Sequence, residues 1–220
     1  MCYNLSMEEK LEFIKGWLKT GSINIFGLPM SGKDTVGVKL AEDLGARFLS
    51  SGMIIRAMEE ETKNKMTGNG ELIPTDLFYE WILPYFERDD LKNEALVLSS
   101  VGRWSGEENE VMESAKNAGH EIKAVVLLET SPEDVMKRWE IVNSLGDEQR
   151  TVRDDDKTLD TFKVRIKEFE EKTEPVISHY DELKLLIRVN GNQDRETVYR
   201  ETIDALYNFA SNSQPAPQAS

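Results

Sequence analysis

The sequence predicts an α/β fold, a three-layer sandwich built around a five-stranded parallel sheet. Five short apolar runs, each of strand length, alternate with stretches of helical periodicity. A glycine-rich loop follows the first run and precedes a helical pattern, which gives the order strand, loop, helix. Such alternation is expected where helices cover both faces of a parallel sheet, and 220 residues are enough for one domain with a buried core.

The first predicted element is an amphipathic helix over Met7 to Lys19. Ser6 is a candidate N-cap with Glu9 three residues later, and the apolar side chains of this stretch recur at helical spacing. A membrane or partner helix is the alternative, but so short an apolar stripe is more typical of a helix that packs on the body of the protein. We therefore interpret residues 1–20 as an N-terminal helix that precedes a single domain at 21–210.

The alternating elements follow in chain order. The predicted strands are Ile23 to Phe26, Ala46 to Leu49, Ala95 to Leu98, Ala124 to Leu128 and Leu185 to Val189. The predicted helices are Lys33 to Leu44, Gly106 to Ala118, Pro132 to Trp139 and Asp160 to Tyr180. A mostly helical stretch at 51–91 and a polar, loop-like stretch at 140–153 interrupt the alternation, and we interpret both as insertions over the cleft at the carboxyl ends of the strands. The Ser, Pro, Gln and Ala tail at 211–220 is predicted to be disordered.

Composition narrows the class of partner. The net charge is -14, with 41 acidic against 27 basic residues, which disfavours nucleic acid or an anionic membrane surface. An anionic substrate would need cations gathered locally in one cleft. Cys2 is the one cysteine and the histidines number 2, so neither an internal disulfide nor a structural zinc site is expected. No apolar run of membrane-spanning length or signal-peptide pattern is present, so we expect a soluble cytoplasmic protein.

The loop after the first strand carries the strongest chemical signal. It reads Gly27-Leu28-Pro29-Met30-Ser31-Gly32-Lys33-Asp34-Thr35. In such a phosphate-binding loop the glycines let backbone N–H groups turn inward, the lysine reaches the β- and γ-phosphates, and the next helix adds its N-terminal dipole. A hydroxyl residue usually follows the lysine at once, whereas here Asp34 intervenes. The alternative, a glycine-rich turn with no ligand, is disfavoured by the strand before it and the helix after it.

Further motifs follow the loop in a fixed order. They are Ser-Ser-Gly-Met-Ile-Ile-Arg at 50–56, Gly-Glu-Leu-Ile-Pro at 70–74, Arg103 after the third strand, Ser131 to Arg138, Arg-Asp-Asp-Asp at 153–156, Arg165 with Thr173, Pro175 and Tyr180, and Val-Asn-Gly at 189–191. In these motifs the chain resembles the adenylate kinase family of nucleoside monophosphate kinases from about Ile23 to Leu206. The late hydroxyl of Thr35 is a trait of that family, whereas Met30 and Asp34 stand where its loop has glycines.

The resemblance implies transfer of the ATP γ-phosphate to a nucleoside monophosphate, with AMP the first choice and Mg²⁺ bound with ATP as cofactor. The implied catalytic residues are Lys33 on the donor phosphates and Arg103, Arg138, Arg153 and Arg165 around the acceptor phosphate and the migrating group. The implied ATP-binding residues are Gly27, Pro29, Met30, Ser31, Gly32, Lys33, Asp34, Thr35, Arg138 and Gln193. The implied acceptor-binding residues are Ser51, Gly52, Arg56, Glu71, Leu72, Ile73, Arg103, Glu107, Arg153 and Arg165.

The resemblance also implies an architecture. The insertion at 51–91 would bind the acceptor, a short lid at about 139–153 would close without a zinc site, and the protein would be a monomer. No general base is expected, because phosphoryl transfer passes through a loose transition state that mainly needs positioning and electrostatic stabilisation.

Three departures from the family pattern leave alternatives open. Met53 and Ser99 stand where the family has aspartates that organise the water shell of Mg²⁺, so we name no protein ligand to the metal. Asp34, or the aspartates at 155–156 near the lid, are the candidate substitutes, although a helix N-terminal role is slightly favoured for Asp34. Glu107 replaces a glutamine that reads adenine. It either contacts a base edge that presents donors, such as guanine, or accepts from the exocyclic amine of adenine alone, or is a solvated first-turn glutamate. The acceptor could then be CMP, UMP, a deoxynucleotide or GMP, or the protein could bind nucleotides without turnover.

Overall fold

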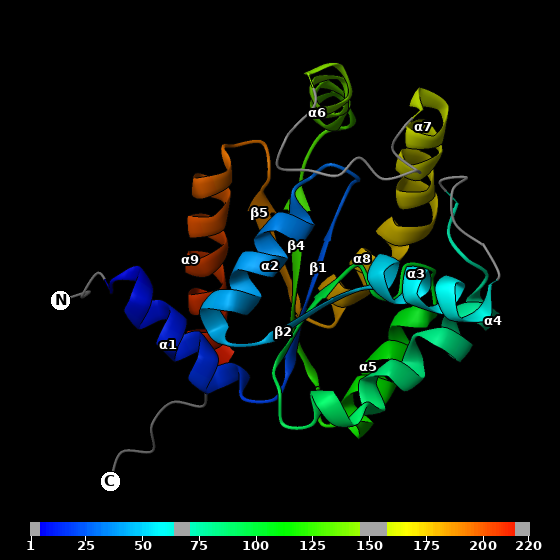
Figure 1. Cartoon of the computed structure of the whole chain (residues 1–220). Coiled ribbons are helices and arrows are strands. Elements are labelled where there is room, and N and C mark those ends of the chain that lie inside the picture. The colour runs from blue at the N-terminus through cyan, green and yellow to red at the C-terminus, as the bar shows by residue number, and fades with distance from the viewer. Residues whose placement is uncertain (1–4, 64–70, 146–157, 214–220) are drawn as a thin grey trace, which may run out of the picture.

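The computed structural model describes residues 5–63, 71–145 and 158–213. Its centre is a five-stranded sheet in the order β2-β3-β1-β4-β5 (Figure 1). Every neighbouring pair runs parallel. The strands are β1 (Ser22–Gly27), β2 (Arg47–Ser50), β3 (Leu96–Ser99), β4 (Ile122–Glu129) and β5 (Leu186–Asn190). The predicted fold class is therefore confirmed, and all five carboxyl ends lie at one edge of the sheet.

One face of the sheet is covered by α1 (Met7–Leu18), α2 (Lys33–Leu44) and α9 (Arg195–Ser213) (Figure 1). Side chains of β1 such as Ile23 and Ile25 enter this layer and are fully buried. The helix predicted at the N-terminus is confirmed, with a capping box in which Ser6 Oγ accepts from the Glu9 N–H at 3.2 Å and Glu9 Oε2 accepts from the Ser6 N–H at 2.7 Å. Its apolar stripe packs into the core, as expected.

The other face is covered by a larger helical layer (Figure 1). Its elements are α3 (Ser51–Thr62), α4 (Thr75–Trp81), the 3-10 turns η1 (Leu83–Glu87) and η2 (Asp89–Leu91), α5 (Glu107–Asn117), α7 (Leu159–Glu168), the π-helical turn η4 (Phe169–Thr173) and α8 (Glu174–Glu182). The mostly helical character predicted for 51–91 is thus seen in its described part, while residues 64–70 lie outside the described residues.

The structure corrects three helix boundaries. The stretch 140–145, predicted as loop, continues helix α6 (Pro132–Leu145), since the apolar side chain of Trp139 stacks on Phe162 of α7 with ring centroids 5.7 Å apart. The single helix predicted over 160–180 is divided into α7, η4 and α8. Helix α9 was not predicted, and it runs to Ser213, three residues into the tail predicted to be disordered. In the part of the chain that the structure describes, no helix is both long and apolar enough to cross a membrane.

Candidate active site

The loop between β1 and α2 has the backbone of a phosphate-binding loop. Gly32 has a φ of 93°, in the left-handed region that glycine adopts without strain. At Gly27 a Cβ atom would lie 2.5 Å from Ser31 Oγ, so any larger residue would collide with the loop itself. The loop therefore needs both glycines, one for its backbone angle and one for the close approach of the chain.

Met30 keeps a glycine-like backbone in this loop. Its φ is 64°, which costs a residue with a Cβ roughly 1–2 kcal/mol. Its side chain is only 6% exposed and belongs to the same apolar cluster as Phe26 and Leu28. Burial of a methionine side chain contributes about 1.5–3 kcal/mol, which offsets the strain. Met30 thus adopts the left-handed backbone angle that a glycine would adopt without strain.

Lys33 opens α2, so its ammonium and the helix N-terminus act at the same place. Its Nζ lies 3.5 Å from the carbonyl oxygen of Leu28, which folds the side chain back over the loop. A helix N-terminus and a lysine together attract phosphate oxygens. Thr35 lies in the same first turn and is exposed.

Arg138 of α6 joins three segments above the loop. Its Nη1 donates to the carbonyl oxygens of Met30 at 3.3 Å and Ser31 at 3.2 Å, and its Nη2 donates to that of Gly191 at 2.6 Å. Gly191, in the turn after β5, is itself required, because a Cβ there would lie 2.7 Å from Thr130 Cγ2. The arginine predicted at the donor site is therefore held over the phosphate loop. Gln193, by contrast, donates from Nε2 to Glu201 Oε2 of α9 at 2.6 Å.

Asp34 and Ser99 meet at the carboxyl end of β3. Ser99 Oγ donates to Asp34 Oδ1 at 2.6 Å, and Ser99 is 1% exposed. In the sheet register Ser99 pairs with Ile25 of β1 and Ser50 of β2. The first turn of α2 is thereby tied to the middle of the sheet edge.

The loop after β3, which carries Arg103, is held from inside the protein. Asn24 of β1, fully buried, donates from Nδ2 to the carbonyl oxygen of Val101 at 2.8 Å and accepts from its N–H at 3.3 Å. Ser100 and Gly102 have positive φ angles of 52° and 77°. Asn24 was not singled out from the sequence, although one amide between Ile23 and Ile25 in a buried strand is the signal that indicates it.

Glu107 fastens the other end of that loop. Its Oε2 accepts from the backbone N–H groups of Arg103 at 2.9 Å and Trp104 at 3.0 Å, and its Oε1 accepts from Thr75 Oγ1 at 3.0 Å. The residue is 2% exposed, so the solvated first-turn alternative is wrong. Burial raises the pKa of the Glu107 carboxyl, while the two backbone donors act in the opposite direction. The carboxylate thus organises the loop that positions Arg103.

A second set of contacts joins the described part of the insertion at 51–91 to α7 and η4. Glu168 Oε2 accepts from the Leu72 N–H at 3.2 Å and from Lys172 Nζ at 2.5 Å. Lys172 Nζ also lies 4.0 Å from the ring centroid of Trp104. Sequence reasoning missed Trp104 and Lys172, because their proximity depends on the π-helical turn. Of the neighbouring predicted residues, Ile73 is buried and Glu71 is exposed.

The remaining predicted acceptor residues lie on α3 and α7. Ser51 and Gly52 begin α3, whose N-cap Ser50 accepts from the Met53 N–H at 3.2 Å. The Arg56 guanidinium lies over Gly52, where a Cβ would be 3.1 Å from Nη1. Arg165 of α7 is 8% exposed. Arg153, and the lid residues 146–153 with it, lie outside the described residues.

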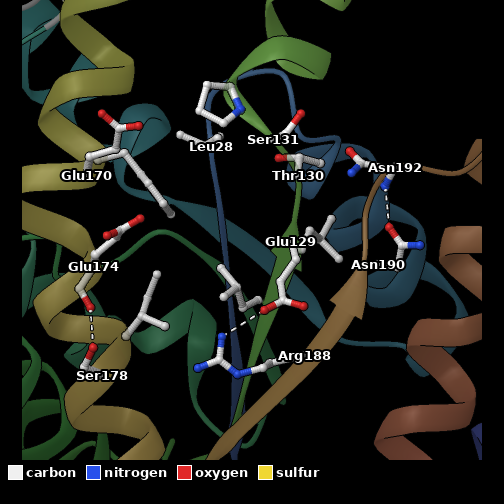
Figure 2. Close-up of a pocket in the computed structure, with 15 residues that line it drawn as sticks. Leu28, Glu129, Thr130, Ser131, Glu170, Glu174, Ser178, Arg188, Asn190 and Asn192 are labelled. Atoms are coloured by element: carbon white, nitrogen blue, oxygen red, sulfur yellow. Dashed lines mark hydrogen bonds and ion pairs between the residues drawn. The ribbon is translucent and has the colours of Figure 1, made fainter.

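A pocket of about 670 Å³ borders the phosphate loop at Leu28 and lies between α8 with η4 and the carboxyl ends of β4 and β5 (Figure 2). None of the predicted site residues lines it. Glu170 and Glu174 face Glu129 across the opening (Figure 2), and Arg188 pairs with Glu129 Oε1 at 2.9 Å. Three carboxylates beside one arginine disfavour phosphate, so the pocket does not compete with the loop as the nucleotide site.

Comparisons with known proteins bear on the same residues. The family model described as adenylate kinase matches residues 25–185. The adenylate kinase of Streptococcus thermophilus (strain CNRZ 1066) is 26% identical over 211 residues, covering 83% of this chain and 96% of the relative. The adenylate kinase of Streptococcus pneumoniae (strain CGSP14) is 26% identical over 208 residues, covering 84% of this chain and 98% of the relative. All predicted site residues except Gln193 lie inside the matched segment.

Proposed function

The chain belongs to the adenylate kinase family, and from that premise we propose that it transfers the γ-phosphate of ATP to AMP, with two ADP as products. That it is a nucleoside monophosphate kinase follows from the family and from relatives named adenylate kinase. AMP is proposed as the acceptor because it is the acceptor that the relatives' name implies.

The observation that carries the proposal is the position of Arg138. Its guanidinium lies against the carbonyl oxygens of Met30 and Ser31, so a cation from α6 stands over the loop that Lys33 closes. Two cations beside a helix N-terminus favour a polyphosphate against a surface whose net charge is -14. We propose Lys33 and Arg138, with the loop residues and Gln193, as the ATP side of the site.

The acceptor side is proposed around Arg103. The loop that carries it is fixed by Asn24 and Glu107, so its backbone is preorganised before any ligand binds. Arg56 on α3 would share the acceptor phosphate with it, and Arg165 with Arg153 would stabilise charge on the migrating group. Preorganised cations of this kind supply most of the catalysis in phosphoryl transfer, and no side chain is required as general base.

Magnesium is proposed to bind together with ATP. It would neutralise charge on the β- and γ-phosphate oxygens. The Asp34 carboxylate beside the loop offers oxygen, the type of ligand that Mg²⁺ takes, and the Ser99 hydroxyl donates to it, so the residues present fit the ion.

Two observations favour narrower alternatives. Glu107, which replaces a glutamine that reads adenine, bonds the backbone of its own loop, so adenine would lack that contact and a different base in the acceptor is favoured. The exposed thioether of Met53 and the hydroxyl of Ser99, where the family has carboxylates, favour a nucleotide-binding protein with little turnover. Both alternatives keep ATP as the donor ligand.

A coupled assay tests the proposal. Purified protein is supplied with ATP, Mg²⁺ and one monophosphate at a time, and diphosphate is measured, with Lys33→Ala as the blank. Lys39→Ala, on the same helix and paired with Asp43 at the surface, is the matched control. Turnover with AMP above every other acceptor supports the proposal, and turnover that prefers another monophosphate replaces the acceptor. ATP binding without turnover on any acceptor would refute the proposed activity.

A further inference from the structure

We propose that Asp34, oriented by Ser99, is the carboxylate that places Mg²⁺ in the donor site, and this rests on the proposed function. The assignment moves the metal-placing carboxylate from the strand end to the first turn of α2. Position 99 then no longer supplies a ligand, and supplies the hydroxyl that aims one.

The position of Asp34 follows from chain order and from the sheet. It comes directly after Lys33, so it starts from the phosphate loop. Ser99 is the last residue of β3, which lies beside β1, the strand that feeds the loop. The hydrogen bond of 2.6 Å between Ser99 Oγ and Asp34 Oδ1 therefore places the carboxylate between the loop and the carboxyl end of the sheet. Hydroxyl-to-carboxylate bonds of this length are the strong, charge-assisted kind.

The same bond decides against a purely helical role for Asp34. A capping carboxylate accepts from the N–H groups of its own helix. The N-cap of α2 is Gly32, which has no side chain to cap the helix, and Asp34 Oδ1 accepts from a different element 65 residues away. Ser99 is 1% exposed, so its hydroxyl is fixed in place by the sheet. The buried Ser99 hydroxyl therefore fixes the direction of the Asp34 carboxylate.

A second observation in the loop indicates a ligand beside it. Ser31 is 2% exposed, and its hydroxyl oxygen has no hydrogen-bond partner among the described residues. That oxygen turns across the loop toward Gly27, where an added Cβ would lie 2.5 Å from it. Buried hydroxyls almost always have partners, so one without a partner inside a phosphate loop is expected to meet a ligand group.

The chemistry matches the way Mg²⁺ is bound with nucleotides. The ion keeps several waters and uses one or two carboxylates together with substrate phosphates, rather than a cage of protein ligands. Among the described residues, no group of three or more His, Cys, Asp or Glu side chains could hold a metal. One aimed carboxylate beside the loop is the arrangement that a metal carried in with ATP requires. Ser99 fixes the direction of that carboxylate, as outer-shell groups do for metal ligands.

The test measures ATP affinity by calorimetry at saturating Mg²⁺ and again in EDTA. The quantity compared is the ATP dissociation constant in EDTA divided by that in Mg²⁺. By linkage, this ratio equals the preference of Mg²⁺ for protein-bound over free ATP. For Asp34→Asn we expect that ratio to fall by about tenfold or more, and for Ser99→Ala by about tenfold. The ATP affinity of Asp34→Asn in EDTA should stay the same or rise, since this variant removes a negative charge near the phosphates. Glu42→Gln, exposed on the same helix, should change neither value.

A rescue variant separates metal placement from folding. In Asp34→Asn combined with Ser99→Asp, a carboxylate returns at the strand end, and the Mg²⁺ ratio should recover most of its loss. An unchanged ratio in Asp34→Asn, with wild-type ATP affinity, would overturn this proposal alone. Failure of the wild-type protein to bind ATP under either condition would overturn the proposed function as well. A lower ratio in Asp34→Asn, together with no turnover by the wild-type protein, supports the metal site and contradicts only the kinase activity.

Discussion

The proposed donor loop after β1 and the proposed acceptor loop after β3 lie at the same edge of the sheet but are held in different ways. The donor loop owes its course mainly to backbone angles, with Gly32 and even Met30 in the left-handed region, and the Arg138 side chain that contacts it from α6 is only partly buried. The acceptor loop also has left-handed residues, but buried side chains from outside it, Asn24 and Glu107, bond its backbone. Side-chain changes in the donor loop should therefore affect ligands more than stability. Changes at the anchors of the acceptor loop should affect both.

The largest expected effect is on turnover and comes from the donor side. Lys33→Ala should lower kcat by roughly 10²–10³-fold or more, because the lost ammonium faces charge that develops in the transition state. The free energy of unfolding should change little, since Lys33 is partly exposed in the first turn of α2. Coupled kinetics measure the change in kcat, and urea unfolding measures the change in the free energy of unfolding. Near-wild-type turnover would remove Lys33 from the site.

The next effect is on stability and comes from the acceptor side. Asn24→Ala leaves both the N–H and the carbonyl of Val101 buried without their partner, which should lower the free energy of unfolding by about 2–4 kcal/mol. Turnover should fall at temperatures where the protein is still folded, because the loop that carries Arg103 loosens. Asn109→Ala, at an exposed position of α5, is the control. A stable Asn24→Ala variant with normal kinetics would show that the loop does not need its anchor.

A smaller effect concerns pH. The pKa of the Glu107 carboxyl is raised above its ordinary value of 4.5, so the folded state holds this proton more tightly than the unfolded state. Its contribution to stability is present below that ordinary value and is lost as pH rises through the folded pKa. Glu107→Gln removes the titration while retaining an acceptor for the two N–H groups. Denaturant unfolding from about pH 4 to about pH 7 should therefore show wild type losing stability relative to this variant. A constant difference across that range would contradict the prediction.

The smallest expected effect is a change in the free energy of unfolding at Met30. Met30→Gly relieves the left-handed strain but loses the buried side chain, so the free energy of unfolding should change by less than about 1 kcal/mol. Met30→Ala loses the packing and keeps the strain, so it should be less stable than the glycine variant by about 1 kcal/mol. This reverses the usual order of alanine and glycine. If alanine proves the more stable, the loop backbone does not depend on this left-handed residue.

The sequence pattern predicted a helix or strand correctly where the residues of that element determine its bounds. The predicted α2 range of Lys33 to Leu44 matches the structure, because its cap glycines, Gly32 and Gly45, flank the helix directly and its apolar spacing lies within it. The predictions failed where neighbours decide. The stretch 140–145 was predicted as part of a polar loop, but it extends a helix whose Trp139 stacks on Phe162 of α7 and whose Val142 packs against the same core. Helix α9 was missed although Val198, Ile203 and Leu206 lie at helical spacing and are buried.

The sequence by itself determined the parallel sheet, the phosphate loop and the acidic surface with few cations. Periodicity and glycine spacing depend on residues that are close together in the chain, and net charge depends on composition alone. The tertiary structure alone decided that Ser99 aims Asp34, that Asn24 holds Val101, and that Glu107 turns inward. Each of these pairs a side chain with a group from another element or from the end of a turn. For the Ser99–Asp34 and Asn24–Val101 contacts, sheet order and not sequence spacing brings the groups within hydrogen-bonding distance, because β3 lies beside β1 although α2, β2, α3 and α4 separate them in the chain.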